Sequence, residues 1–138
     1  MKISARNQFT GKVVEIEEGS VNSIVKVEIA AGNVISATIS KDAVEDLGIS
    51  KGKEIAAIIK ATEVMVGKGD LKISARNKFP GKVSSIIEGA VNSKVTIETF
   101  GSNKITATIS NDAVKELELS VGSEAVGIVK ATSVLLAV

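Results

Sequence analysis

The chain lacks the residue types on which most enzyme active sites depend. Its 138 residues include no cysteine and no histidine. Their absence excludes thiolate nucleophiles, disulfides, zinc sites built on these side chains and the usual general base at neutral pH. No group of Asp and Glu residues has the spacing of a carboxylate metal site or of paired catalytic carboxylates. The composition therefore argues against an enzyme.

Aromatic residues and an excess of charge of one sign are also missing. The chain has no Trp and no Tyr, only three Phe, and 17 basic residues against 16 acidic ones. A nucleic-acid-binding OB fold needs stacking aromatics and a basic groove, so a nucleic-acid-binding protein is kept only as an alternative. No apolar run is long enough for a membrane helix, and the N-terminus has no charged segment followed by an apolar stretch. We expect a cytoplasmic protein with no membrane partner.

The sequence repeats one unit twice. Residues 1–68 align without a gap on residues 71–138, and about half of the aligned positions are identical. Two copies are too few for a solenoid, so each copy is expected to be a small domain. We predict domain 1 over residues 1–66, a short flexible linker over residues 67–70 and domain 2 over residues 71–138.

Each copy is rich in strand patterns and contains one short helix. In the first copy the patterns predict strands over residues 11–16, 23–29, 34–39, 54–60 and 62–66, and a helix that ends at Leu47 with Ser40 as its N-cap. Five strands with a short helix between the third and fourth are typical of an OB-type barrel. The predicted fold is all-β with short helices, as two tandem OB-type five-stranded antiparallel β-barrels.

The end of each copy is apolar on both faces of its predicted strands. In residues 55–62 and 125–136, both odd and even positions carry apolar side chains. One face can fill a small barrel, but the second needs another surface, because a module of about seventy residues buries little on its own. We therefore expect packing between domains and between subunits, with Phe9, Phe79 and Phe100 in the core or at an interface.

The hexapeptide Lys2–Asn7 recurs unchanged as Lys72–Asn77. It places a serine hydroxyl, a guanidinium and an amide within four positions and contains no carboxylate. Lys60 and Lys130 each lie inside an apolar run. A tetrahedral dianion needs convergent donors, and one Arg with one Lys neutralises its two charges. We interpret these residues as an oxyanion site. The alternatives are solvated arginines, lysines that reach water along the surface, and an assembly domain whose donors pair with carboxylates of neighbouring subunits.

Three separated motifs occur in the same order in both copies: in the first copy they are Ser4–Asn7, Glu18–Ser23 and Lys60–Thr62. In these motifs the chain resembles the molbindins, small cytoplasmic molybdate-binding proteins made of Mop domains, and in particular the two-domain molbindins. The resemblance implies OB-type barrels, with six Mop domains around a three-fold axis and hence a homotrimer. It also implies binding and storage of molybdate, or tungstate, as the function, with the oxyanion as ligand and no free metal cation.

The resemblance further implies two classes of oxyanion site. In the first class, the Ser-Ala-Arg segment of one module faces the Lys-Ala segment of another. Carried over to this sequence, the first class comprises Ser4, Ala5, Arg6, Lys60, Ala61, Ser74, Ala75, Arg76, Lys130 and Ala131, with Ser40 and Ser110 as further donors. The second class, near the three-fold axis, comprises Gly19, Ser20, Val21 and Asn22 and, in the second copy, Gly89, Ala90, Val91 and Asn92.

Two departures from the family pattern bear on these sites. Members of the family often have serine after the motif lysine, whereas Ala61 and Ala131 offer only a backbone N–H at that position. In the second turn, Ala90 stands at the position of Ser20 and removes one hydroxyl. Asn22 and Asn92 also have an alternative role, as turn residues that satisfy their own backbone.

Overall fold

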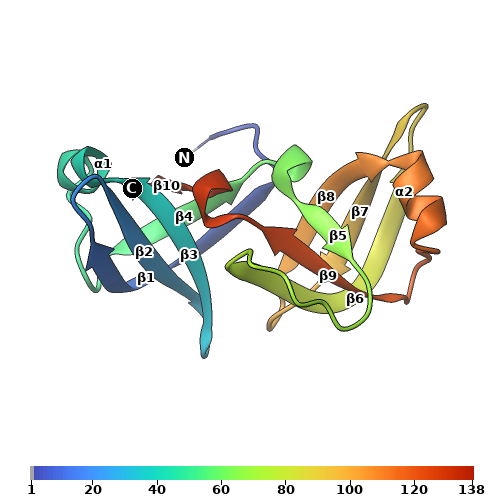
Figure 1. The fold of residues 1–138 in the computed structure, drawn as a ribbon, viewed down its shortest axis with the longest axis horizontal. Coiled ribbons are helices and arrows are strands. Elements are labelled where there is room, and N and C mark those ends of the chain that lie inside the picture. The colour runs from blue at the N-terminus through green and yellow to red at the C-terminus, as the bar shows by residue number, and fades with distance from the viewer. Residues whose placement is uncertain (1) are drawn as a thin grey trace.

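The computed structural model describes residues 2–138 as two β-sheet modules that lie side by side (Figure 1). The elements, in chain order, are β1 (Asn7–Glu18), β2 (Asn22–Ala30), β3 (Asn33–Ser40), α1 (Lys41–Asp46), β4 (Glu54–Ile59), the 3-10 turn η1 (Ala61–Glu63), β5 (Met65–Gly67), β6 (Asn77–Glu88), β7 (Asn92–Glu98), β8 (Lys104–Ser110), α2 (Asn111–Glu116), β9 (Glu124–Val129), the 3-10 turn η2 (Ala131–Ser133) and β10 (Leu135–Ala137). The predicted class, two five-stranded antiparallel OB-type sheets with short helices, is confirmed.

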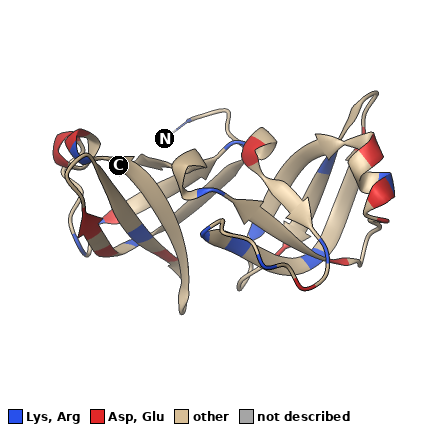
Figure 2. Cartoon of the chain, viewed as in Figure 1, with Lys and Arg blue, Asp and Glu red and all other residues tan. Residues whose placement is uncertain are grey.

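The two α-helices begin where the sequence predicted. The Ser40 hydroxyl accepts a hydrogen bond from the backbone N–H of Ala43 at 3.0 Å, and Ser110 caps α2 in the same way. Asp42 and Asp112 lie in the first turns, where a negative charge is favourable. Acidic residues are therefore prominent on the helices at the two outer ends of the molecule (Figure 2). Within residues 2–138, no helix has the length and apolar character needed to cross a bilayer.

The last strand of each half completes the sheet of the other half. The strand order is β10-β4-β1-β2-β3 in the first sheet and β5-β9-β6-β7-β8 in the second. Leu135 of β10 pairs with Ile58 of β4, and Met65 of β5 pairs with Ile128 of β9. Figure 1 shows both exchanged strands lying against the other module. Each sheet thus takes four strands from one repeat and its edge strand from the other.

The exchange changes the end of the predicted fifth strand. We expected one strand over residues 62–66, but the chain makes a 3-10 turn at Ala61–Glu63 and only Met65–Gly67 is extended. The turn redirects the chain out of its own module, because β5 has to reach β9 rather than return beside its own β1. The sequence pattern correctly predicted apolar residues here but not the direction that the chain takes.

One hydrophobic cluster spans both modules, and a second, smaller cluster has all its buried residues in the first copy. Phe9 and Phe79 occupy equivalent positions in the repeat, and their rings stack with centroids 5.7 Å apart. Phe100 packs against Phe79 at 6.0 Å. In β4, the consecutive residues Ala57, Ile58 and Ile59 are all buried, so both faces of this strand are covered. The predicted packing between domains, with the three phenylalanines in the core or at the interface, is confirmed.

The turn before β7 is stabilised by side-chain hydrogen bonds of Asn111 that the first copy lacks. The Asn111 amide donates to the carbonyl of Gly89 at 2.9 Å, and its oxygen accepts from the hydroxyl of Ser93 at 2.5 Å. The first copy has Lys41 at the position of Asn111. Ser23, the counterpart of Ser93, is buried, and its hydroxyl has no hydrogen-bond partner within residues 2–138. A buried hydroxyl without a partner destabilises the fold.

The substitution Lys41→Asn is expected to form the same side-chain hydrogen bonds in the first copy. It should raise the free energy of unfolding by about 1 kcal/mol, because Ser23 gains an acceptor. The reverse change, Asn111→Lys, should lower it by about 1–3 kcal/mol, because Ser93 loses its acceptor. Urea unfolding of the two variants and the parent chain measures both effects. Identical unfolding midpoints in all three proteins would contradict this account.

The strand exchange predicts the behaviour of an isolated first copy. A fragment of residues 1–70 has β4 and β5 but neither β10 nor β9 to pair with them. Two such fragments can restore both ladders by exchanging β5, so we expect a dimer. Size-exclusion chromatography with light scattering measures the mass. A matched fragment of residues 1–63 lacks β5 and should not dimerise, whereas a folded, monomeric 1–70 fragment would refute the exchange.

Candidate anion-binding site

The antiparallel register of β1 and β4 brings the two halves of the predicted site together. Asn7, the first residue of β1, pairs with Ile59, the last residue of β4. Arg6 precedes β1 and Lys60 follows β4, so both lie at the same end of the strand pair. In the second copy, Asn77 pairs with Val129 and sets up the same arrangement. In both copies, an arginine and a lysine more than fifty positions apart in sequence are thereby brought to the same end of a strand pair.

In the first copy the two segments line one cavity, with a volume of about 300 Å³. All five predicted residues contribute to its wall: Ser4, Ala5, Arg6, Lys60 and Ala61. The wall also includes residues that the prediction omitted, namely Ile3, Ile58, Thr62 and Leu135. Leu135 belongs to β10, the strand exchanged from the second copy. We call this cavity the Arg6 pocket.

The second copy has the equivalent cavity, of about 360 Å³, which we call the Arg76 pocket. The predicted residues that line it are Ser74, Ala75, Arg76, Lys130 and Ala131. The further residues are Thr38, Met65, Ile73 and Thr132. Met65 belongs to the exchanged strand β5. We expected the Ser-Ala-Arg segment of one module to face the Lys-Ala segment of another. Within the chain, however, both segments of each pocket come from the same copy, and the other copy adds only Leu135 to the Arg6 pocket and Thr38 and Met65 to the Arg76 pocket.

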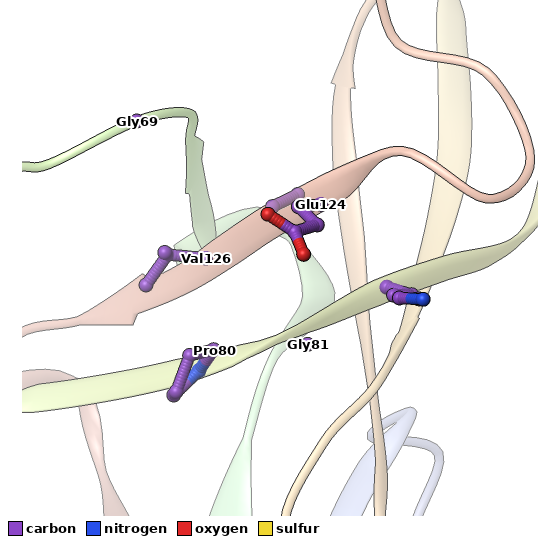
Figure 3. Close-up of a pocket in the computed structure, with 7 residues that line it drawn as sticks. Gly69, Pro80, Gly81, Glu124 and Val126 are labelled. Atoms are coloured by element: carbon purple, nitrogen blue, oxygen red, sulfur yellow. The ribbon is translucent and has the colours of Figure 1, made fainter.

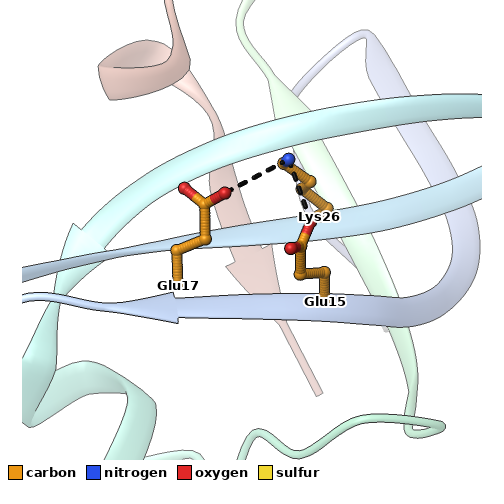
Figure 4. Close-up of polar contacts among 3 residues, drawn as sticks. All are labelled: Glu15, Glu17 and Lys26. Atoms are coloured by element: carbon orange, nitrogen blue, oxygen red, sulfur yellow. Dashed lines mark hydrogen bonds and ion pairs between the residues drawn. The ribbon is translucent and has the colours of Figure 1, made fainter.

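The basic side chains of the two pockets form no ion pair within residues 2–138. Lys26 shows the contrast, since its ammonium lies 2.9 Å from Glu15 and 3.4 Å from Glu17 (Figure 4). Hydrogen bonds to Glu15 and then to Glu17 raise the pKa of Lys26. The arginine and lysine of each pocket have no such carboxylate, so their donors remain available for an anionic ligand.

The backbone beside the lysines is also suited to an anion. Lys60 is the N-cap of η1 and Lys130 that of η2, and neither makes a side-chain capping bond. Ala61 and Ala131, the first residues of these turns, are only 8% and 7% exposed. The first N–H groups of a helical turn have no acceptor within the turn. A methyl side chain leaves that N–H open to a ligand oxygen.

The Ser-Ala-Arg segment is held differently in the two copies. In the first copy the side-chain amide of Gln8 donates to the carbonyl of Ile3 at 3.2 Å and to that of Ala5 at 3.1 Å. The second copy has Lys78 at this position, and a lysine side chain cannot reproduce the planar amide geometry. Sequence reasoning missed Gln8 as a positioning residue, because it is one of the positions at which the repeats differ.

The asparagine of the hexapeptide has a structural role instead of a place in the pockets. The Asn7 amide donates to the carbonyl of Thr106 in β8, and its oxygen accepts from the N–H of Thr106, both at 2.8 Å. Asn77 makes the same pair of bonds with Ser36 in β3. Both asparagines are 2% exposed. Grouping this amide with the ligand donors was therefore wrong. The Asn7 amide joins β1 to β8, and the Asn77 amide joins β6 to β3, which is in each case the third strand of the other copy.

Two other predicted groups lie outside the Arg6 and Arg76 pockets. Ser40 and Ser110 line neither pocket, and their oxygens accept the capping bonds of α1 and α2. The turns at residues 19–22 and 89–92 are exposed, with Val21 and Val91 each 72% exposed. The turn of the second copy is closed by a backbone bond from Gly89 to Asn92.

A larger cavity, of about 480 Å³, lies elsewhere, around Gly81 in β6 (Figure 3). Gly81 is required there because a Cβ would collide with the backbone carbonyl of Glu98. The cavity contains Lys82 and Glu124, one charge of each sign, so it lacks the convergent positive charge of the Arg6 and Arg76 pockets. Within residues 2–138, no three Asp or Glu residues cluster as a metal site would require.

The substitution Asn7→Ala is expected to weaken the junction between the copies. It leaves the backbone N–H and C=O of the half-buried Thr106 without their Asn7 partners, so the free energy of unfolding should fall by about 1–3 kcal/mol. Asn33→Ala, in an exposed hairpin turn, is the matched control and should change it by less than about 0.5 kcal/mol. Urea unfolding measures both. Equal effects of the two substitutions would show that the Asn7 pair does not hold the copies together.

Comparison with known proteins gives a consistent result. The TOBE domain family matches residues 3–66 and 73–136. The chain is 40% identical over 139 residues to the molybdenum transport protein ModE of Azotobacter vinelandii and covers 52% of it, so the chain spans about half the length of this relative. One copy is 64% identical over 67 residues to a probable molybdenum-pterin-binding protein of Haemophilus influenzae, covering 49% of this chain and 97% of that protein.

A solved structure resembles the whole chain. The cytoplasmic molybdate-binding protein ModG, crystallised with molybdate bound, superimposes with a TM-score of 0.96 at 38% identity, over 100% of this chain and 99% of that one. The family match covers both repeats, and the structural match includes their arrangement. The chain therefore belongs to the TOBE domain family and consists of two Mop-type domains in tandem, which confirms the molbindin resemblance.

Proposed function

We propose that this chain binds molybdate, and tungstate as an anion of the same shape and charge, in the Arg6 and Arg76 pockets. The observation that carries the proposal is the convergence of the Ser-Ala-Arg and Lys-Ala segments on one cavity in each copy. Each pocket supplies an arginine and a lysine without a carboxylate partner, which matches the two charges of the anion. ModG and the ModE and pterin-binding relatives, whose names refer to molybdate or molybdenum, support the choice of anion.

The hydrogen-bond donors of each pocket can account for micromolar affinity for the anion. Hydrogen bonds to charged groups contribute about 1.5–3 kcal/mol each. Four or five of them, reduced by the cost of association, give about −8 kcal/mol, which corresponds to a micromolar dissociation constant. Sulfate has shorter bonds to oxygen, so it cannot span the same donors, and pocket size is the basis for its exclusion. The pockets contain nothing that separates molybdate from tungstate.

The proposed assembly is a homotrimer in which neighbouring chains cover the pockets. Apolar side chains are exposed at the rim of each pocket: Ile3 and Leu135 at one, Met65 and Ile73 at the other, with exposed fractions between 41% and 53%. Exposed apolar groups in such positions favour contact with another protein surface. The first-class sites are then completed by a second chain, and the turns at residues 19–22 and 89–92 meet near the three-fold axis as the second class.

The proposed role is storage and homeostasis of the oxyanion in the cytoplasm, without catalysis. The relatives' names refer to transport and binding, and ModG is described as cytoplasmic. Nucleic-acid binding is not proposed, because Phe9 and Phe79 are buried and Phe100 packs on Phe79. None of the three aromatic side chains is free to stack on a base.

Native mass spectrometry tests the assembly and the ligand together. In the presence of molybdate or tungstate, we expect a trimer with at least two anions per chain, and no comparable binding of sulfate or phosphate. The double variant Arg6→Ala/Arg76→Ala should lose the anions of both pockets and remain a trimer, because the guanidiniums lie outside the shared core. The control, Lys51→Ala/Lys104→Ala, removes two lysines remote from the pockets. A monomer that binds none of the four anions would refute the proposal.

A further inference from the structure

The two 3-10 turns of the chain touch each other at equivalent positions of the repeat. The hydroxyl of Ser133 in η2 donates a hydrogen bond of 3.2 Å to the carboxylate of Glu63 in η1. Ser133 follows Glu63 by seventy positions, so each residue is the counterpart of the other. Figure 1 shows both turns near the middle of the molecule, η1 in green and η2 in red. The hydrogen bond therefore joins one copy to the other.

A contact between equivalent residues places this pair beside the pseudo-two-fold axis that relates the two copies. Two groups related by a two-fold axis can touch each other only where they lie next to that axis. Phe9 and Phe79 are a second pair of this kind, with ring centroids 5.7 Å apart in the shared cluster. The axis thus passes from the buried phenylalanine rings to the surface, where Glu63 is exposed and Ser133 is half-buried.

The strongest contacts of the junction do not distinguish one copy from the other. The stacked rings both belong to phenylalanine. The amides of Asn7 and Asn77 bond only to backbone groups of the opposite copy, which almost any residue supplies. The same contacts would form if two first copies met. The choice of partner therefore has to come from a position at which the copies differ.

Glu63 and Ser133 differ in charge, and they differ where the copies touch. In the observed pairing, the carboxylate accepts a hydrogen bond from a neutral hydroxyl, and it forms no ion pair within residues 2–138. If two first copies paired in the same way, two carboxylates would face each other across the axis. Like charges about 4 Å apart in water weaken such a pairing about fivefold. Two first copies can still pair through exchanged strands, but more weakly than unlike copies do.

We propose that Glu63 and Ser133 make the contact surface between the copies selective, so that a first copy pairs with a second copy in preference to another first copy. The first copy is synthesised before the second, and the unpaired modules that it meets at that stage are first copies of other new chains. The outer edge of β4 is then open, because β10 has not yet been made. An open strand edge invites pairing with another chain. Repulsion between Glu63 side chains opposes that pairing until Ser133 is available.

Four full-length chains test the selectivity: the parent, Ser133→Glu, Glu63→Ser and the exchanged double variant Glu63→Ser/Ser133→Glu. Ser133→Glu places two carboxylates beside the axis, so it should raise the equilibrium constant for unfolding about fivefold. The exchanged variant again has one carboxylate and one hydroxyl, and should recover the parent's value. Sodium chloride at about 1 M should remove most of the effect of Ser133→Glu, because it screens exposed charges. Urea unfolding without molybdate measures these constants, and Ser102→Glu, in the exposed β7–β8 turn, is the control.

Refolding from urea tests the choice of partner directly. At high protein concentration, Glu63→Ser should give more oligomers larger than the parent's assembly, because two first copies no longer repel each other. The exchanged variant should refold as the parent does, since its second copies repel each other instead. Size-exclusion chromatography with light scattering measures the fraction of these larger oligomers.

The outcomes decide the inference without reference to anion binding. A loss of stability in Ser133→Glu that the second substitution and salt both reverse, and that Ser102→Glu does not show, supports the proposal. A Ser133→Glu chain as stable as the parent at low salt would overturn it, and so would a loss that the exchanged variant does not correct. If Ser133→Glu does not fold, refolding of Glu63→Ser decides, and a fraction of large oligomers equal to the parent's would overturn the proposal.

Discussion

Strands β5 and β10 each complete the sheet of the other repeat, and the remaining features of the chain follow from that exchange. With the edge strands exchanged, neither sheet has all five strands unless both copies are folded. The stacked rings of Phe9 and Phe79 and the amide bonds of Asn7 to Thr106 then bury the surface between the copies. The two repeats consequently share a hydrophobic cluster that spans both copies.

The same exchange shapes the two pockets proposed to bind an anion. The Arg6 pocket lies where the end of the β1–β4 pair meets β10, and the Arg76 pocket lies where the end of the β6–β9 pair meets β5. The cations come from the strand pair, and Leu135 or Met65 of the other copy completes the wall, so each pocket is complete only in the assembled tandem. A ligand that binds the folded form alone stabilises it in proportion to the logarithm of its concentration. An oxyanion that binds in the proposed pockets is therefore expected to stabilise the tandem.

The sequence predicted the features that depend on local residues and missed those that depend on the other copy. Strand periodicity, the Ser40 cap and the four pocket cations could be read from residue type and spacing, since each reflects local geometry or charge. The exchange of β5 and β10 could not, because a short apolar strand has the same pattern whether it pairs with its own sheet or with its neighbour's. Asn7 was misjudged for the same reason. Its sequence shows an amide, and only the fold shows that the amide bonds to Thr106.

Differences between the repeats carry information that the shared motifs do not. If a single-copy protein assembled its modules symmetrically, every pocket would be identical, because one residue at a given position serves all modules. A tandem chain removes this constraint, since Lys94 can change without changing Ile24, and Asn111 without changing Lys41. Duplication thus allows equivalent positions of one fold to carry different residues in its two halves.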